Sequence, residues 1–213
     1  MARVTLSFDN GPDLEGTPRV LDALAARGLR TTFFAVGRRL ERPGARALLE
    51  RARREGHWIG NHSYSHGTPL GRDPSFEAAA REIDGAQALL GELVHEDLPF
   101  RPFGGGGRLD RNLLSRAALA RLVAGRHTLV LWSCVPGDWV DAGWIDRALT
   151  EIGGRREALV VLHDTVADTA ARLPEFLDVL ETAGHEIAQA WPEDCVPIRR
   201  GAVRRPLDAW IAD

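Results

Sequence analysis

The residues most able to do chemistry follow short apolar runs. The stretch NHSYSH supplies two histidines, His62 and His66, at a spacing that can aim both imidazoles at one metal ion. Asp9, in SFDNGPD, adds a carboxylate after another apolar run. Two neutral nitrogens and one oxygen leave coordination positions open for water and substrate, as hydrolytic zinc sites require. The sequence therefore indicates metal-assisted hydrolysis.

Other reactive side chains occupy the same place relative to predicted strands. They are Arg101, Asp138, Trp139, His163 and Asp164. In a parallel barrel the carboxyl ends of the strands meet on one face, where such barrels build their active sites. Polar residues without a joint purpose would be expected at both ends of the strands. We therefore predict one active-site mouth, with Asp164 serving as a cap or structural residue beside it.

Short β-branched or aromatic runs alternate with helical patterns along the chain. The predicted strands are 3–8, 31–36, 57–62, 128–134, 158–164 and 185–191, and PFRPFG (99–104) could add a short one. The predicted helices are 17–28, 44–56, 75–94, 113–125, 144–154 and 170–184. This alternation favours a parallel sheet covered by helices and a small (β/α) barrel. No GxGxxG follows the first strand, which disfavours a dinucleotide-binding fold.

Two of these helices carry specific burial predictions. In 44–56 the spacing places Ala47, Leu48 and Ala52 on the buried face. In 75–94, Ser75 is the predicted N-cap. The predicted buried face of that helix comprises Phe76, Ala79, Ile83, Leu90 and Leu93.

Composition limits the class of protein. A chain of 213 residues with 44% hydrophobic residues suits one domain spanning 1–213. A net charge of −3 gives no reason to expect a nucleic-acid partner. The chain contains no apolar run long enough for a transmembrane segment and no recognisable signal peptide, so we expect a cytoplasmic location. Two cysteines are too few for a disulfide framework, and Cys134 is expected to be a buried thiol.

Five ordered motifs resemble those of the polysaccharide deacetylase family, also called the NodB-homology or carbohydrate esterase 4 group. They are SFDNGPD (7–13), HSYSH (62–66), RPFG (101–104), VPGDW (135–139) and LHD (162–164). The family patterns are TFDDGP, HxxSH, RxPY, DxxDW and LHD. The resemblance covers nearly the whole chain. It implies an α/β fold, a distorted (β/α)7 TIM-like barrel, that hydrolyses the carbon–nitrogen bond of an N-acetyl group on an amino sugar or oligosaccharide with a divalent metal, commonly Zn²⁺.

The resemblance also implies roles for individual residues. Asp9 matches the base that activates the attacking water, and Arg101 matches the residue that orients this base. His163 matches the general acid that protonates the leaving amine. Asp138 matches the carboxylate that supports this histidine. Histidine titrates near neutrality, and a neighbouring carboxylate raises its pKa and fixes its orientation, so the chemistry of these residue types agrees with the implied roles.

The remaining implied roles concern the metal and the substrate. His62, His66 and Asn10 match the metal ligands. Trp139 and Leu162 match the apolar walls around the acetyl methyl group. In the family, the amide after the arginine-motif proline helps to hold the oxyanion, and here Phe103 or Gly104 could present that N–H.

The chain departs from the family pattern at three positions. Asn10 stands where the family has a ligand aspartate, Pro102 directly follows Arg101, and Val135 replaces a carboxylate. Asparagine keeps one ligand oxygen but loses the charge, so metal affinity should fall. Asp9 also lacks an anionic neighbour that would raise its pKa, which makes it a weaker base.

Two alternatives to the metal-dependent deacetylase follow from these departures. One is a metal-independent relative that opens or deformylates a small amide, which Asn10 and the apparent lack of a secretion signal favour. The other is a catalytically silent protein that binds amino-sugar oligomers. The presence of both His163 and Asp138 disfavours the silent protein, because a binding module needs no proton donor.

Overall fold

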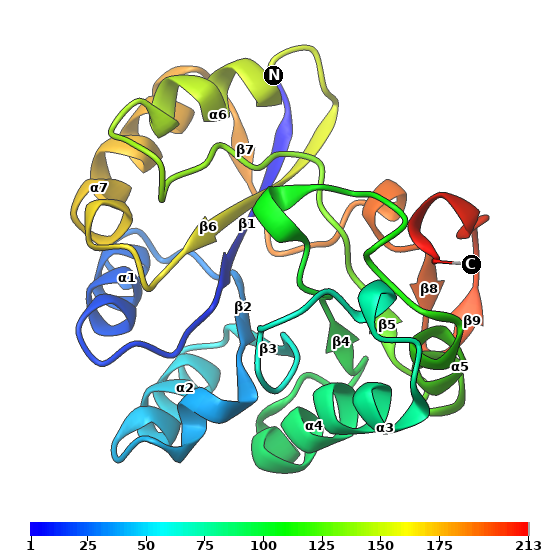
Figure 1. The fold of residues 1–213 in the computed structure, drawn as a ribbon. Helices are drawn as coiled ribbons and strands as arrows, with labels where there is room; N and C mark the ends of the chain where they lie inside the picture. The colour runs from blue at the N-terminus through cyan, green and yellow to red at the C-terminus, as the bar shows by residue number, and fades with distance from the viewer. Residues whose placement is uncertain (213) are drawn as a thin grey trace.

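A curved, mainly parallel sheet forms the centre of the molecule (Figure 1). The computed structural model describes residues 1–212. Its strands are β1 (Arg3–Asp9), β2 (Thr32–Ala35), β3 (Trp58–Asn61), β4 (Pro99–Phe100), β5 (Thr128–Leu129), β6 (Glu157–His163), β7 (Glu186–Ile187), β8 (Ile198–Arg199) and β9 (Ala202–Val203). The strand order is β6-β1-β2-β3-β4-β5-β8-β9, and β7 pairs with β1. Among the described strands, only the β5–β8 and β8–β9 pairs are antiparallel.

Backbone bonds beyond β5 bring the chain back to β6. Cys134 forms a parallel bridge with Val160, and the Cys134 carbonyl accepts from the N–H of Val161 at 3.0 Å. The predicted strand 128–134 is nevertheless short, because Leu131 bonds instead to the carbonyl of Cys195. The bridge joins the β5 side of the sheet to β6, the strand at the opposite end of the order, which produces a distorted and incomplete barrel.

Helices surround the sheet (Figure 1). They are α1 (Gly16–Ala25), α2 (Ala45–Arg54), α3 (Phe76–Ala79), α4 (Gly85–Leu90), α5 (Arg116–Ala124), α6 (Trp144–Ile152) and α7 (Ala167–Thr182). Short 3-10 turns are η1 (Gly37–Glu41), η2 (Leu70–Arg72), η4 (Gly91–Leu93), η5 (Gly105–Gly107), η6 (Glu193–Cys195) and η7 (Asp208–Trp210). A π-helical turn, η3 (Ala80–Asp84), separates α3 from α4 and interrupts the single helix predicted for 75–94. Ser75 caps α3 as predicted, because its hydroxyl accepts from the N–H of Ala78.

Two hydrophobic clusters occupy opposite faces of the sheet around β6. Side chains alternate between the faces of a strand. Accordingly Val160 and Leu162 join a cluster that contains α1 and α7 residues, whereas Val161 joins a cluster with residues of β4, β5 and α5. The side of β6 that faces the candidate site is therefore the one carrying Val161 and His163.

The arginine-rich segment 199–206 contributes to the β8–β9 hairpin, and its arginines are partly paired. Arg199 and Arg200 both form ion pairs with Asp97. No helix within residues 1–212 combines the length and the apolar character needed to cross a bilayer.

Candidate active site

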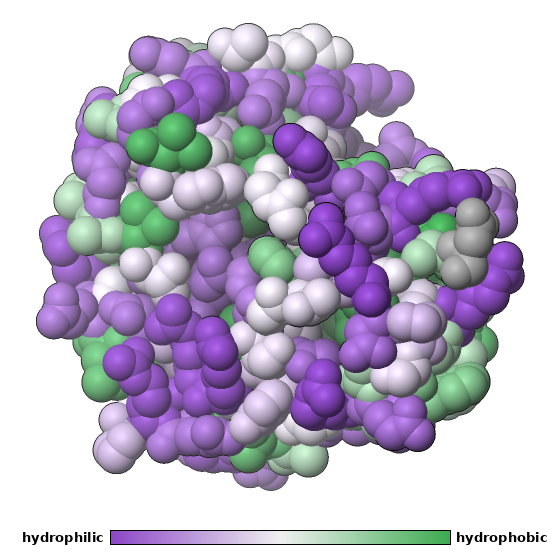
Figure 2. All heavy atoms as spheres, in the orientation of Figure 1, coloured by the Kyte–Doolittle hydropathy of each residue, from purple (hydrophilic) through white to green (hydrophobic). Residues whose placement is uncertain are grey.

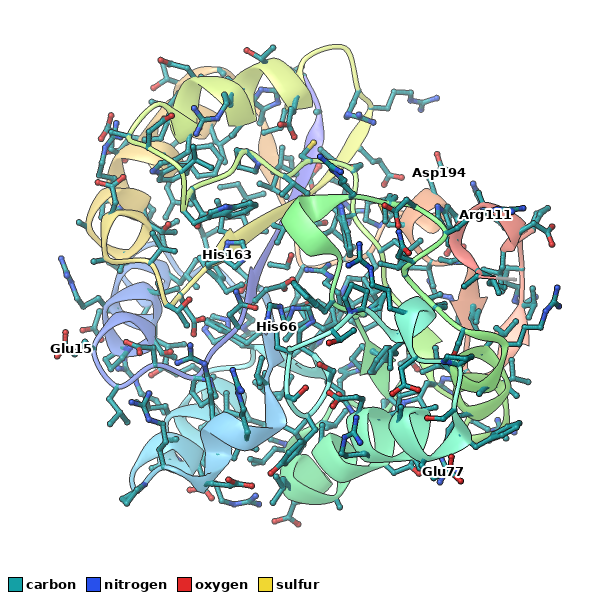
Figure 3. All side chains as sticks on the ribbon, in the orientation of Figure 1. Glu15, His66, Glu77, Arg111, His163 and Asp194 are labelled. Carbon is teal, nitrogen blue, oxygen red and sulfur yellow. The ribbon has the colours of Figure 1, made fainter. Side chains whose placement is uncertain are left out.

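Residues from the ends of four strands surround one cavity of about 230 Å³. The parallel register of β1 and β6 sets Asp9 directly beside His163. Figure 3 shows His66 and His163 at the same central opening, whereas the other labelled residues lie at the periphery. The predicted site residues that line the cavity are Asp9, Asn10, His62, His66, Phe103, Gly104, Trp139 and His163. The structure thus brings together residues that are far apart in sequence, as expected from their strand-end positions.

Arg101 lies fully buried behind the cavity and fixes the orientation of Asp9. Its Nη1 donates to Asp9 Oδ1 at 2.8 Å and to Ser7 Oγ at 2.7 Å. The guanidinium also stacks over the Phe34 ring, with its carbon 4.0 Å from the centroid. Burial raises the pKa of Asp9, although the charges of Arg101 and His163 oppose this effect. Asp9 is therefore a carboxylate held in one orientation and destabilised in its charged form, as suits a base.

The backbone of the same arginine orients His62. The Arg101 carbonyl lies 2.8 Å from His62 Nδ1, and a carbonyl can only accept, so Nδ1 carries the proton. His62 Nε2 is then left with a lone pair, 3.5 Å from Asp9 Oδ2. Burial lowers the pKa of His62 to about 3, so the ring is neutral at pH 7. When Asp9 is ionised, its Oδ2 and His62 Nε2 are both acceptors and face each other. The gap between them suits a cation or a proton.

The loop that carries His66 is held by its own polar contacts. Ser63 Oγ accepts from the His66 N–H, and the buried Glu82 carboxylate accepts from both the N–H and the hydroxyl of Ser65. These contacts bring the His66 ring to 4.7 Å from that of His62. Burial, together with His62, lowers the pKa of His66 to about 3. Both imidazoles are therefore neutral, the form that binds metals.

Asn10 has the features of a ligand without a partner. Its Oδ1 is buried and accepts no hydrogen bond within residues 1–212, which is costly unless another group binds it. Its backbone is left-handed, with φ of 75°, a conformation that asparagine and aspartate tolerate better than most residues. The orphaned oxygen and two neutral imidazoles fit a divalent cation. No group of three or more histidine, cysteine, aspartate or glutamate side chains within 1–212 is arranged to hold a metal ion, so such a site would depend on the asparagine oxygen.

His163 and Asp138 form a hydrogen-bonded pair on the other side of the cavity. Asp138 Oδ1 lies 2.7 Å from His163 Nδ1, and Oδ2 accepts from the His163 N–H and from Thr169 Oγ1. Burial lowers the pKa of His163, but the hydrogen bond and charge of Asp138 outweigh it, so the pKa is raised overall. Asp138 is buried and does not line the cavity. It therefore acts through His163, where its charge and hydrogen bond favour the protonated ring.

The apolar wall differs from the prediction at one position. Trp139 lines the cavity and packs its ring edge-on to His163, with centroids 4.9 Å apart. Leu162 does not line it, which corrects the prediction from the LHD motif. The period of two along β6 sends Leu162 into the opposite cluster, and Val161 takes its place at the cavity.

Several residues of the site were not predicted. Trp132 and Val135 line the cavity, and Trp132 Nε1 donates to the carbonyl of Gly107, so this indole supports the glycine-rich loop. The apolar run that contains Trp132 gave a signal, since it precedes the VPGDW motif. Ser7 and Thr169, which support Arg101 and Asp138, gave no recognisable signal.

The four other histidines lie outside this cavity. Each has a backbone hydrogen-bonding partner through Nδ1, as expected of structural residues. The partners are Thr31 for His57, Asp97 for His95, Leu98 for His127 and Ala2 for His185.

Asp164 lies behind the loop that carries Asn10. Its Oδ2 accepts from Thr17 Oγ1 at 2.5 Å, while Oδ1 is buried and has no hydrogen-bond partner in the described part of the chain. A Cβ added at Gly11 would lie 2.2 Å from Asp164 Oδ2, so only glycine allows the loop to pass this close. Burial raises the pKa of Asp164 to about 7. The structural role predicted for Asp164 agrees with these contacts.

The raised pKa of Asp164 makes stability depend on pH. Because the folded protein binds this proton more tightly than the unfolded chain, the contribution is complete below the ordinary pKa of 3.8 and is lost as pH rises through about 7. Asp164→Asn removes the titration. Between pH 4 and 8, wild type should lose up to about 4 kcal/mol of unfolding free energy relative to this variant, since each pKa unit corresponds to about 1.4 kcal/mol. Chemical denaturation across pH measures the difference, and parallel curves would contradict the expectation.

Comparison with known proteins agrees with this geometry. Residues 2–123 match the family model described as polysaccharide deacetylase. A peptidoglycan-N-acetylglucosamine deacetylase of Bacillus cereus is 30% identical over 189 residues, covering 85% of this chain and 83% of the relative. The corresponding enzyme PgdA of Listeria monocytogenes is 28% identical over 187 residues, which cover 86% of this chain, but the match spans only 37% of PgdA.

A solved structure extends the similarity to the whole chain. The family 4 carbohydrate esterase of Streptomyces lividans, in complex with acetate, has a TM-score of 0.71 and 25% sequence identity. The alignment covers 100% of this chain and 98% of that one. The predicted barrel type is thereby confirmed. The chain belongs to the polysaccharide deacetylase family of enzymes.

Proposed function

We propose that this chain removes the N-acetyl group from an amino sugar or N-acetylated oligosaccharide. The observation that carries the proposal is the placement of Asp9 and His163 side by side at one cavity, each held by its own buried partner. Amide hydrolysis needs a base for the water and an acid for the departing nitrogen. The names of the relatives, which are peptidoglycan-N-acetylglucosamine deacetylases, support the choice of an N-acetylated sugar.

Each residue then has a defined task. Asp9 takes a proton from the attacking water, while Arg101 holds the carboxylate toward the cavity. His163 gives a proton from Nε2 to the leaving nitrogen, because Nδ1 is engaged by Asp138. The N–H groups of Phe103 and Gly104 find no acceptor within residues 1–212, so they are free to donate to the developing oxyanion. Trp139 and Val161 supply the apolar surface for the methyl group.

A divalent cation, with Zn²⁺ the expected ion, completes the proposal. His62 and His66 would bind it through neutral nitrogens, and Asn10 through its orphaned oxygen. When bound, the ion supplies positive charge that polarises the acetyl carbonyl and lowers the pKa of the attacking water.

Acetate release from a small panel of N-acetylated sugars, measured before and after chelation, tests this function. We expect release that chelation abolishes and added Zn²⁺ restores. Full activity after exhaustive chelation would instead favour the metal-independent hydrolase. Calorimetric binding of the oligosaccharides without any acetate release would favour the silent glycan-binding protein.

Asn10→Asp tests the proposed metal site independently of activity. Aspartate restores a negative charge at an oxygen ligand and accepts the same left-handed backbone. We expect the affinity for Zn²⁺ to rise at least about tenfold, a change of only about 1.4 kcal/mol. Titration calorimetry of metal-free protein measures it, and Co²⁺ absorption spectra report the ligand set. Equal affinities for the two proteins would place the metal away from residue 10.

A further inference from the structure

A second, smaller cavity of about 60 Å³ adjoins the candidate active site. The two cavities share Phe103 and Gly104 as a common wall. On its active-site side, Phe103 packs against His66, with ring centroids 4.1 Å apart. A ligand in the second cavity would therefore lie one residue away from the groups that surround the scissile amide.

The charge of the second cavity differs from that of the chain as a whole. Arg72, from η2, and Arg108, just after η5, both line it and are exposed. Neither side chain donates a hydrogen bond or forms an ion pair within residues 1–212, whereas many other arginines of this chain are paired. Asp110 is the acidic residue of the lining, and its Oδ1 accepts from the N–H of Asn112 at 2.8 Å. Two cations and one anion leave a local positive charge on a chain whose net charge is −3.

Two glycines, Gly104 and Gly105, line the second cavity beside the shared wall. A Cβ at Gly104 would lie 2.6 Å from the Trp132 ring, so this residue is fixed against the indole. A Cβ at Gly105 would meet nothing within 4 Å, so the space above this residue is open. Figure 2 shows a pale, weakly polar centre on this face with a run of strongly hydrophilic side chains beside it. A substituent on a bound sugar could cross the low wall at Gly104 and Gly105.

We propose that this second cavity is a subsite for a carboxylate carried by the glycan on the sugar next to the one that is deacetylated. A guanidinium offers paired donors that match the two oxygens of a carboxylate. Arg72 and Arg108 approach the subsite from different segments, so both can contribute a charge-assisted hydrogen bond. The inference rests on the proposed function and narrows its substrate class to acidic N-acetylated oligosaccharides.

Two matched oligosaccharides test the subsite. Both contain the same N-acetylated sugar and have the same length, but only one carries a carboxylate on the neighbouring sugar. We expect kcat/KM to be at least about tenfold higher for the acidic one, as charge-assisted hydrogen bonds allow. The double variant Arg72→Gln/Arg108→Gln should lose this preference through a higher KM, while its activity on the neutral oligosaccharide stays unchanged.

Two further variants separate the subsite from general charge effects. Arg53→Gln/Arg54→Gln removes the same charge from two exposed residues of α2 that do not line either cavity, and it should keep the preference. Gly105→Trp fills the open space beside the wall and should lower kcat/KM for the acidic oligosaccharide most. If the α2 variant also lost the preference for the acidic oligosaccharide, the preference would arise from the overall charge of the protein, and the subsite would be overturned.

Binding distinguishes failure of the subsite from failure of the proposed function. Calorimetry with the Asp9→Asn protein measures the affinity for both oligosaccharides without turnover. Tighter binding of the acidic oligosaccharide, lost in Asp9→Asn combined with Arg72→Gln/Arg108→Gln, supports the subsite even if no acetate is released from any substrate. Equal affinities for the two oligosaccharides would overturn the subsite, whether or not the wild type deacetylates the neutral one.

Discussion

Replacement of Asp9 by asparagine should lower kcat for deacetylation by about 10²–10⁴-fold, the range of a lost general base. Asparagine keeps the shape and one acceptor for Arg101 but has no basic oxygen to take a proton from water. Burial raises the pKa of Asp9, so the wild-type rate should also rise with pH as this carboxyl group ionises. Steady-state acetate release across pH measures both effects.

Asp13→Asn is the matched control for this variant. Asp13 belongs to the same motif, but it does not line the cavity, and its Oδ1 acts as an acceptor for the N–H of Gly16, which asparagine can replace. The control should leave kcat nearly unchanged. Because Arg101 is fully buried and loses its anionic partner in Asp9→Asn, thermal unfolding should be measured in parallel. A folded Asp9→Asn protein with wild-type kcat would contradict the role of Asp9 as base.

Replacement of His163 by glutamine should also lower kcat by about 10²–10⁴-fold, since glutamine cannot protonate the leaving nitrogen. His185→Gln is the control, because His185 lies outside the cavity and contacts the backbone N–H of Ala2. Steady-state acetate release by the two variants compares their kcat values. Equal losses in the two proteins would show that the effect does not arise at the active site.

Asp138, the hydrogen-bonding partner of His163, should shift the pH dependence of kcat in one direction. A general acid must be protonated, so activity falls as pH rises through the pKa of His163. The Asp138 carboxylate raises that pKa, and Asp138→Asn removes the negative charge. The alkaline limb of the kcat profile should therefore move to lower pH in Asp138→Asn. An unshifted limb would mean that another group supplies the proton.

The expectation that active-site residues follow the carboxyl ends of parallel strands located much of the site from the sequence alone. Asp9 and His163 each end a strand that the apolar runs predicted, and the β1–β6 register makes them neighbours. Arg101 was placed on the same face, but no spacing argument would put it 2.8 Å from Asp9. Such contacts between distant segments depend on strand register, which the sequence does not state.

The errors arose where the face of an element had to be chosen. Leu162 was assigned to the cavity from its motif, although the alternation of β6 directs Val161 there. In α2 the structure buries Leu49 and leaves Ala47 exposed, because two adjacent leucines fit either face until the start of the helix is known. Ala52 is buried there as predicted.

The periodic pattern of apolar residues also failed to predict some local features. Phe76 is 67% exposed, although its spacing from Ala79 and Ile83 matched one helical face. The later residues of that predicted face, Ala79, Ile83, Leu90 and Leu93, are buried as predicted, although a π-helical turn follows α3. The short β8–β9 hairpin had no apolar alternation to reveal it.

The most direct test of the central claim is acetate release from an oligomer of N-acetylglucosamine by metal-loaded protein, compared with His62→Ala. Because Arg101 fixes His62 toward Asp9, loss of this ring should remove both the bound ion and the chemistry it supports. We predict acetate and free amine in equal amounts from the wild type, and neither product nor stoichiometric metal in the variant. Unchanged turnover by a folded His62→Ala protein would contradict the account.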